Sequence, residues 1–300
     1  MMRTPRASDQ GYPTGAPRLS IVIVTYNSHD QIDACLSSLS THPPSMEHEV
    51  TVVDNASGDG TVAAVQQGWP DVHVIETGRN LGFAAASNAG MRKTSGEFVL
   101  LLNPDTRVTA GAIDALTAHL VATPDAAVVG PRIVDGDGRA EVSFGAMIGP
   151  VAELRQKLLV TGSARVPLVR AYVDRITRDS KDVDWVSGAC LLVRREDAEA
   201  VGLLDERYFM YTEDVDFCAS IRARHRRVLF TADAEVVHLR GRSVASAPRP
   251  TDMAYRRSQL AFYEKHHPRW APILRAYLTL RRRLPDKQGV MPHDQGRPSP

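Results

Sequence analysis

The stretch Glu97-Phe-Val-Leu-Leu-Leu102, followed directly by Asn103-Pro104-Asp105, decides how the first half of this chain folds. A continuous apolar run of this length that ends beside a proline is typical of a strand buried on both faces of a parallel sheet. Open α/β sheets bind ligands at the carboxyl ends of their strands. Asp105 therefore lies where a carboxylate can hold a divalent cation against a diphosphate, although Asn-Pro-Asp taken alone is equally an ordinary turn.

Strand-like and helix-like segments alternate around this run. Short continuous apolar runs are separated by stretches in which apolar residues recur at helical spacing. Such alternation predicts an α/β fold with a parallel, right-handed sheet over the first ~110 residues. We expect strands at 20–25, 50–54, 72–75 and 97–102, helices at 61–68 and 84–94, and a further helix that a Ser28–Gln31 capping box begins and Pro43-Pro44 ends.

The second half alternates less regularly. Its patterns predict helices at 112–122 and 216–224, and strands at 127–134, 186–193, 228–231 and 235–238. Asp135-Gly-Asp-Gly138 predicts a hairpin turn. It is not a calcium-binding loop, because the position that must supply a bidentate acid is Ala146. Residues 143–182 show no clean period, so we expect an irregular insert of the kind that forms a mobile loop over a site.

The composition is typical of a cytoplasmic globular protein. With 43% hydrophobic residues in 300, the chain can bury a sizeable core, and its net charge of +1 gives no reason to expect a nucleic-acid partner. No apolar run approaches the ~20 residues that span a bilayer, and the polar N-terminus lacks the apolar segment of a secretory signal. Cys35, Cys190 and Cys218 are odd in number and widely spaced, which predicts buried, reduced thiols.

Other polar residues follow predicted strands and are expected at the same sheet edge as Asp105. The Asp54 carboxylate can accept the N3–H of a pyrimidine or simply cap the end of its strand. Thr25-Tyr26-Asn27 can wall a base or form an ordinary turn. Arg79 can neutralise a diphosphate and Gly82 lets the backbone approach closely, although an exposed turn would look the same.

Six short motifs in a fixed order make the chain resemble the family 2 glycosyltransferases, which have the GT-A fold. The likeness covers residues 19–245 and is closer to bacterial rhamnosyltransferases that extend cell-wall or O-antigen glycolipids, although galactofuranosyl- and hexosyl-transferases share the frame. The motifs are Thr25-Tyr26-Asn27, Val53-Asp54-Asn55-Ala-Ser57, Asn80-Leu-Gly82-Phe83, Asn103-Pro104-Asp105, Trp185-Val-Ser-Gly188-Ala-Cys-Leu-Leu-Val-Arg194 and Asp205-Glu-Arg-Tyr-Phe-Met-Tyr-Thr-Glu213-Asp214-Val-Asp216.

The resemblance implies a fold and a donor site. It predicts a GT-A fold: a mixed, mostly parallel central sheet flanked by helices, with a C-terminal helical extension. Asn103-Pro104-Asp105 stands where the family has its D-x-D metal motif, so Asp105 is the one carboxylate of that motif expected on Mg²⁺ or Mn²⁺. His238 matches a histidine that also ligates the metal in some members. The donor is expected to be a sugar linked to dTDP or UDP. The residues expected to contact it are Thr25, Tyr26, Asn27, Asp54, Asn55, Arg79, Asn80, Gly82, Asn88, Asn103 and Asp105.

The resemblance also implies the reaction. Asp214 matches the catalytic base, which takes the proton of an acceptor hydroxyl while the sugar leaves its nucleoside diphosphate with inversion. Glu213 is expected to orient the acceptor, and Asp216 to cap the following helix. The acceptor side is matched by Trp185, Gly188 and Ala189. These matches predict an inverting glycosyltransferase, with dTDP-L-rhamnose the favoured donor and a glycan or polyprenyl-diphosphate-linked saccharide the acceptor.

Three alternatives stay open. Another family 2 hexosyl- or galactofuranosyl-transferase would use a UDP-sugar on the same frame. A sugar-nucleotidyltransferase also combines a nucleotide fold with a metal, but it usually carries a Gly-rich basic loop where this chain has Tyr26-Asn27-Ser28. A non-catalytic nucleotide- or carbohydrate-binding module would not need Asp105, Asp214 and His238 together.

The two ends of the chain differ from its middle. We expect a disordered leader at 1–18, a catalytic domain at 19–245, a basic amphipathic helical extension at 246–284 and a disordered tail at 285–300. Such an extension fits peripheral contact with the cytoplasmic face of the plasma membrane, and it fits equally a helix packed on the catalytic domain. Its apolar residues at helical spacing are Trp270, Ile273, Leu274, Tyr277 and Leu278, and its basic residues are Arg256, Arg257, Lys265, Arg269, Arg275, Arg281, Arg282 and Arg283.

Overall fold

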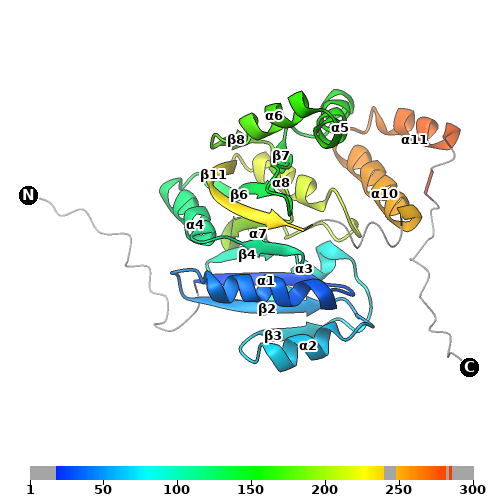
Figure 1. Cartoon of the computed structure of the whole chain (residues 1–300). Coiled ribbons are helices and arrows are strands. Elements are labelled where there is room, and N and C mark those ends of the chain that lie inside the picture. The colour runs from blue at the N-terminus through cyan, green and yellow to red at the C-terminus, as the bar shows by residue number, and fades with distance from the viewer. Residues whose placement is uncertain (1–17, 240–247, 282–283, 286–300) are drawn as a thin grey trace, which may run out of the picture.

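The apolar run that ends at Leu102 forms the middle strand of a large mixed sheet (Figure 1). The computed structural model describes residues 18–239, 248–281 and 284–285. The strands of the sheet are β1 (Leu19–Thr25), β2 (His48–Asp54), β3 (His73–Glu76), β4 (Phe98–Leu102), β5 (Thr106–Val108), β6 (Ala126–Val134), β8 (Lys181–Val183), β10 (Cys190–Arg194) and β11 (Arg227–His238). Their order is β3-β2-β1-β4-β10-β6-β11-β5, with β8 paired to β11.

Strand direction places the carboxyl ends of six strands at one edge of the sheet. Strands β3, β2, β1 and β4 are mutually parallel, as predicted. Strand β10 runs antiparallel to both β4 and β6, and β11 is parallel to β6. Strands β6 and β11 therefore point the same way as β4. The carboxyl ends of β1, β2, β3, β4, β6 and β11 consequently lie at a single edge.

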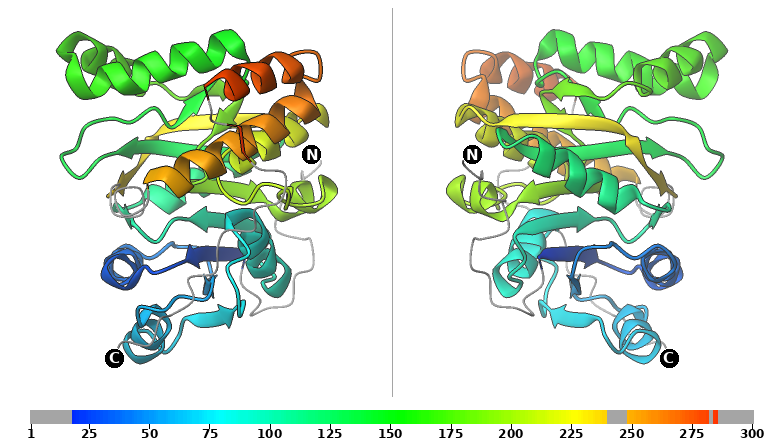
Figure 2. Two further views of the ribbon diagram at one scale, coloured as in Figure 1. Left: turned by 90° about the vertical axis from the view of Figure 1, so that its right-hand side faces the viewer. Right: turned by 90° about the vertical axis from the view of Figure 1, so that its left-hand side faces the viewer.

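Helices cover both faces of this sheet (Figures 1 and 2). They are α1 (His29–Thr41), α2 (Thr61–Gly68), α3 (Phe83–Lys93), α4 (Ala112–Ala122), α5 (Pro150–Arg165), α6 (Pro167–Ile176), α7 (Arg195–Ala200), α8 (Glu213–Ala223), α10 (Pro248–His266) and α11 (Ala271–Leu280). Alternate residues of β1 serve the two faces: Ile21 and Ile23 pack with α1 and α4, whereas Val22 and Val24 pack with α3 and α8.

The structure confirms the α/β fold and corrects several local predictions. Ser28 precedes α1 but makes no side-chain capping bond, so the capping box was wrong. The strand predicted at 186–193 is broken into β9 (Trp185–Val186), which pairs with β7 (Phe144–Gly145), and β10. The two strands predicted at 228–231 and 235–238 are one strand, β11, with a register shift between Thr231 and Glu235.

The irregular insert predicted at 143–182 was also wrong, because α5 and α6 occupy most of it. The reason for the error is physical. None of the sixteen residues of α5 is buried, and its apolar residues lie on several sides of the helix, so they do not form the single apolar face of a helix packed on a core. Helix α6 begins with Pro167 in its first turn and buries only Val173.

The C-terminal helices pack on the rest of the chain. Leu260, Phe262 and Tyr263 of α10 are buried, and the last two belong to the same apolar cluster as Val22 and Val24. Of the two alternatives for the extension, packing on the catalytic domain is thus observed for α10. The division of the chain at residue 245 stays a prediction. The proposed tail beyond Pro285, the leader before Arg18, and Arg282 and Arg283 lie outside the described residues.

In the described ranges, no helix is long and apolar enough to cross a membrane. The three cysteines are free and buried, as predicted. Burial raises the pKa of Cys35 and of Cys218 to about 12.

We predict that Gly90→Ala destabilises the fold although Gly90 lies inside helix α3. Alanine is favoured in a helix by about 1 kcal/mol, but a Cβ at this position would lie 2.5 Å from Val22 Cγ1 in β1. Overpacking costs about 1–3 kcal/mol, so we expect a net loss of about 1–2 kcal/mol. Urea unfolding measures it. Gly68→Ala in α2, with nothing within 4 Å of the new Cβ, is the control and should unfold no earlier than wild type. Equal midpoints for Gly90→Ala and wild type would contradict the close packing.

Candidate active site

Asp105 and His238, which are far apart in sequence, meet at the shared sheet edge. Strands β5 and β11 pair antiparallel, with Thr106 opposite His238, and Leu239 N–H donates to the Asp105 carbonyl at 2.8 Å. This pairing brings His238 Nε2 to 3.2 Å from Asp105 Oδ1. The Asp105 side chain keeps 25% of its surface exposed. A carboxylate oxygen and an imidazole nitrogen at this separation can bind one cation together.

Glu141 is a second acid at this position, and it was not among the site residues predicted from the sequence. Its Oε2 lies 3.7 Å from His238 Nδ1, and its backbone N–H donates to the Ile133 carbonyl at 2.9 Å. The residue follows the hairpin turn at Asp135–Gly138, in a stretch with no motif to mark it. Only the return of the chain along β6 brings it to His238.

The fit of these residues to a divalent cation is partial. Within the described ranges, no group of three or more His, Cys, Asp or Glu side chains is arranged to hold a metal ion. Asp105 and His238 supply two adjacent oxygen and nitrogen ligands, and the pyrophosphate of a bound nucleotide commonly supplies others. Asp105 and His238 therefore offer two of the ligands that a divalent cation needs, and Asp105 is the one acid of Asn103-Pro104-Asp105.

Two hydrogen bonds donated by backbone N–H groups link this edge to Asp214. Asn103 N–H, at the end of β4, donates to the Ala189 carbonyl at 2.9 Å, because Cys190 of β10 pairs with Leu102. Gly188 N–H then donates to Asp214 Oδ2 at 2.8 Å. A Cβ on Gly188 would lie 3.3 Å from the Asp214 Cβ. The segments that carry Asp105 and Asp214 are thus linked through residues 188 and 189.

Glu213 and Asp214 begin helix α8 side by side but differ in environment. Asp214 accepts hydrogen bonds from the backbone N–H groups of Gly188 and Val215, at 2.8 Å each. Burial raises the pKa of Asp214, and these two bonds limit the rise. Burial and the charge of Asp214 raise the pKa of Glu213 well above its usual range, and its Oε2 has no partner among the described residues. Asp214 is thus the member of the pair better suited to carry the charge.

The backbone before this pair is strained. Tyr211 and Thr212 both have left-handed φ values, of 70° and 72°. Residues other than glycine adopt such angles only where the surrounding structure holds them. One of these restraints is visible just upstream, where Phe83 N–H donates to the Phe209 carbonyl at 2.7 Å. A Cβ on Gly82 would lie 2.3 Å from that carbonyl oxygen, so this approach requires glycine.

The predicted base-binding residues form a compact hydrogen-bonded group at the ends of β1 and β2. Asp54 is 1% exposed, and its carboxylate accepts bonds from the Thr25 hydroxyl at 2.9 Å and from the Ser57 N–H and hydroxyl at 2.8 and 2.5 Å. Asn27 has a left-handed φ of 51° and bonds Ser57 and Gly58. Tyr26 is 47% exposed beside them. Through these bonds Asp54 caps the end of β2. Its contact with a nucleobase stays a prediction.

Asn55 organises the neighbouring loop, which carries Arg79, Asn80 and Gly82. Its side-chain amide donates to the Gly82 carbonyl at 3.1 Å, and its Oδ1 accepts from Leu81 N–H at 3.1 Å. Asn80 Oδ1 accepts from Gly82 N–H at 3.0 Å. Arg79 is exposed beside this turn. Asn55 therefore shapes the loop from within while Arg79 stays accessible to solvent.

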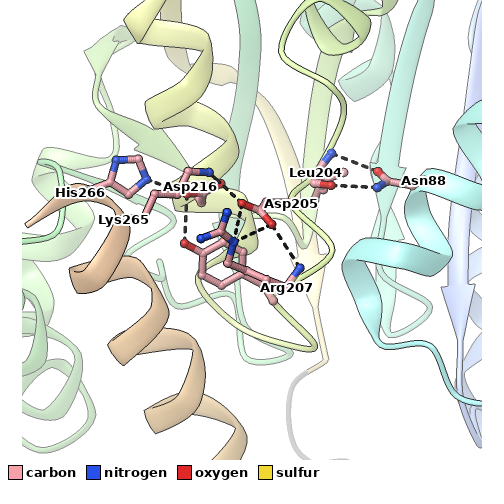
Figure 3. Close-up of polar contacts among 8 residues, drawn as sticks. Asn88, Leu204, Asp205, Arg207, Asp216, Lys265 and His266 are labelled. Carbon is pink, nitrogen blue, oxygen red and sulfur yellow. Dashed lines mark hydrogen bonds and ion pairs between the residues drawn. The ribbon is translucent and has the colours of Figure 1, made fainter. Parts of the chain in front are cut away.

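Asn88 is placed differently from the other predicted donor contacts. It is fully buried on α3, where it donates to the Leu204 carbonyl and accepts from Leu204 N–H, at 2.8 and 3.0 Å (Figure 3). Its amide also donates to Glu206 at 2.9 Å. These bonds tie α3 to the 203–206 segment and use most of its hydrogen-bonding capacity, so direct contact with a nucleotide is not the role that this geometry favours.

Trp185 is likewise a structural element of the acceptor side. It is 4% exposed, its indole N–H donates to the Ala146 carbonyl at 2.9 Å, and its ring covers Gly145 closely enough to exclude a Cβ there. Gly145 and Trp185 are also paired in the β7–β9 sheet. This pairing positions the chain just before Gly188 and Ala189.

The prediction that Asp216 caps helix α8 was wrong, because the N-cap residue of this helix is Thr212. Asp216 is 1% exposed and accepts hydrogen bonds from the Tyr208 hydroxyl at 3.0 Å, from His266 at 2.6 Å and from Lys265 at 2.8 Å (Figure 3). Burial tends to raise the pKa of Asp216, but the bonds from His266 and Lys265 outweigh it and lower that pKa. Lys265 also bonds Asp205 at 2.9 Å. This cluster fastens α10 to both ends of the segment that leads to Asp214.

A match of residues 20–201 to the sequence profile of Glycosyl transferase family 2 covers more than half of the chain. The chain belongs to this family. It is a glycosyltransferase, which decides against the nucleotidyltransferase and the non-catalytic module that the residues alone left open.

The family assignment is supported by relatives of known name. The chain is 35% identical to an N-acetylglucosaminyl-diphospho-decaprenol L-rhamnosyltransferase of Mycobacterium tuberculosis, over 89% of this chain and 92% of that protein. It is 30% identical to a low-salt glycan biosynthesis hexosyltransferase of Haloferax volcanii, over 70% of this chain and 62% of that protein.

Solved structures confirm the GT-A fold. A Pyrobaculum calidifontis mannosyltransferase in complex with GDP-Man and Mn²⁺ superposes with a TM-score of 0.57 at 21% identity, covering 89% of this glycosyltransferase and 71% of that chain. The Staphylococcus aureus protein TarS, residues 1–349 in complex with UDP, gives a TM-score of 0.54 at 18% identity and covers 82% and 65%.

We predict that Asp216→Asn lowers the free energy of unfolding by about 3 kcal/mol, because it removes the charge that Lys265 and His266 share in a buried site. The pKa of Asp216 is lowered on folding, so its contribution is complete above the ordinary value of 3.8 and is lost as the pH falls below it. Urea unfolding of both proteins at pH 7 and below pH 4 measures this. The difference should shrink in acid, and a difference independent of pH would contradict the ionic role.

Proposed function

We propose that this glycosyltransferase transfers L-rhamnose, from dTDP-L-rhamnose, to a saccharide linked to a polyprenyl diphosphate. The observation that carries the proposal is the 35% identity, over nearly the full length of both chains, to a protein whose name states L-rhamnosyl transfer to N-acetylglucosaminyl-diphospho-decaprenol. The residues at the sheet edge and at the start of α8 fit a donor diphosphate and an acceptor hydroxyl on one connected site.

The reaction is a single displacement with inversion. The acceptor oxygen forms a bond to the anomeric carbon while the bond from that carbon to the diphosphate oxygen breaks, and the nucleoside diphosphate leaves with the electron pair. Asp214 accepts the hydroxyl proton as the new bond forms. Its two backbone N–H partners orient the carboxylate before substrate binds, and its raised pKa brings its basicity nearer to the working pH.

Glu213 is the member of the buried pair that more strongly favours the protonated form. Its buried position and its neighbour disfavour a second negative charge, so it can donate a hydrogen bond to the acceptor or support the loop. Arg79, exposed at the edge of the donor side, approaches the leaving diphosphate.

A divalent cation fits the Asp105 and His238 pair, and we propose that these two residues hold Mg²⁺ or Mn²⁺ together with the donor diphosphate. When bound, the ion neutralises the charge that develops on the leaving group. Asp105 and His238 orient that position, and the β5–β11 pairing keeps both side chains in place.

A panel of nucleotide-sugars, scored by released nucleoside diphosphate, tests the donor. With an N-acetylglucosaminyl-diphospho-polyprenol acceptor and Mn²⁺, we expect dTDP-L-rhamnose to give the highest kcat/KM and EDTA to abolish turnover. A UDP-hexose or UDP-galactofuranose as the best donor would overturn the rhamnosyl assignment and leave the glycosyltransferase family intact. Full activity in EDTA would overturn the proposed role of the metal.

Asp214→Asn tests the base. We expect kcat to fall by at least about 100-fold while dTDP binding, measured by calorimetry, is unchanged, because the side chain keeps its shape but cannot accept the proton. In wild type, the rate should fall as the pH drops through the pKa of Asp214, which lies above the ordinary value of 3.8. Glu213→Gln is the matched control and should lose much less. Near-normal turnover in Asp214→Asn would remove the assignment.

A further inference from the structure

Most of the exposed large hydrophobic side chains gather on one side of the molecule. Figures 1 and 2 place α5, the start of α6 and α11 together, on the side away from β2 and β3. Of the thirteen large hydrophobic residues exposed in the described ranges, ten belong to these segments. They are Val151, Leu154, Leu158, Val160, Val166, Leu168, Trp270, Ile273, Tyr277 and Leu280, and we call them, with α5 and α11, the α5–α11 face.

Helix α11 carries apolar residues on its exposed side as well as on its buried side. Ala271 and Leu278 are buried against the protein, whereas Trp270, Ile273 and Tyr277 recur three or four residues apart and are 48%, 59% and 50% exposed. A helix on a water-exposed surface usually has polar residues in such positions. Helix α5 also exposes apolar side chains, because Val151, Leu154 and Leu158 recur at the spacing of one helical face.

The two helices form one surface. Helices α5 and α11 lie side by side in Figures 1 and 2, and both contact α10, which packs against α11 and bonds Glu153 of α5 through Tyr263. The surface is also basic. Helices α5, α6 and α11 carry two acids, and Glu153 and Asp174 are both engaged in hydrogen bonds with α10 and with arginines. Their basic residues are Arg155, Lys157, Arg165, Arg170, Arg175 and Arg275.

Apolar and aromatic side chains framed by arginine and lysine match the chemistry of an anionic bilayer surface. Trp and Tyr favour the interface, the aliphatic side chains enter the acyl boundary, and the basic groups stay at the phosphates. We propose that the α5–α11 face docks this protein on an anionic lipid membrane. The inference rests on the proposed function in one respect, since a polyprenyl-linked acceptor is presented at such a surface.

Helix α10 connects this face to the catalytic segment. Tyr263 donates its hydroxyl to Glu153 of α5 at 3.0 Å, and the Ser258 hydroxyl donates to the Met210 carbonyl at 2.7 Å. The rings of Tyr255 and Tyr211 lie 6.1 Å apart, edge to face. Residues 210–212 lead directly into Glu213 and Asp214. A bilayer bound at the α5–α11 face therefore lies one helix away from the proposed acceptor site.

Vesicle sedimentation of the full chain, without donor or acceptor, tests the docking surface. We expect binding to vesicles of phosphatidylcholine with phosphatidylglycerol and little binding to phosphatidylcholine alone. Leu154→Ser/Ile273→Ser, which changes one exposed residue on each helix, should weaken binding at least about tenfold. Val121→Ser, an equally exposed apolar residue on α4, is the control and should bind as wild type does.

Charge is tested separately. Lys157→Gln should weaken binding to the anionic vesicles several-fold, and Lys93→Gln on α3 should not change it. Activity on a short-chain, water-soluble acceptor should be the same in all these variants, so a failure of the membrane inference stays distinct from a failure of the proposed function. Equal sedimentation of wild type and Leu154→Ser/Ile273→Ser would overturn the proposal. A wild-type dimer in size-exclusion chromatography that this variant dissociates would overturn it too, because a second copy would then cover the face.

Discussion

The antiparallel seam between β4 and β10 is the constraint on which the site depends. Because β10 runs against β4, the segment that precedes β10 lies at the same edge as the segment that follows β4. The Asn103 N–H bond to Ala189 and the Gly188 N–H bond to Asp214 then link the segment of Asp105, the proposed cation ligand, to Asp214, the proposed base. A purely parallel sheet would place residues 188–189 at the opposite edge.

A second set of contacts holds the loop that leads to Asp214, the proposed base. The left-handed residues Tyr211 and Thr212 store strain immediately before Glu213, and such strain persists only where neighbours hold both ends of the loop. On one side Phe209 bonds Phe83, next to the donor loop. On the other, Asp216 is anchored by Lys265 and His266 of α10 (Figure 3). The C-terminal helix is therefore part of the support of the active site.

Helix α10 also links the segment before Asp214 to the outer surface of the protein. Helix α10 contacts α5 through Glu153 and contacts the 210–212 segment through Ser258 and Tyr255, so one helix touches both the exposed apolar face and the approach to Asp214. Glu213 adds a buried acid whose raised pKa follows from the same enclosure. This arrangement suits the proposed transfer to a lipid-linked acceptor, because the proposed membrane-docking face and the proposed base, Asp214, contact the same helix-supported segment.

The sequence by itself determined the α/β fold, the parallel β1–β4 half, the motif order and the family, because continuous apolar runs and short motifs at strand ends are local signals. It missed α5, whose sixteen residues bury nothing, and Glu141, which carries no motif. The sequence predicted that Asn88 contacts the nucleotide and that Asp216 caps helix α8. Only the tertiary structure decided these positions, because burial and hydrogen-bond partners from distant segments, such as Leu204 for Asn88 and Lys265 for Asp216, fix what each side chain can reach. The meeting of Asp105 with His238 was decided in the same way, by strand pairing across more than a hundred residues of chain.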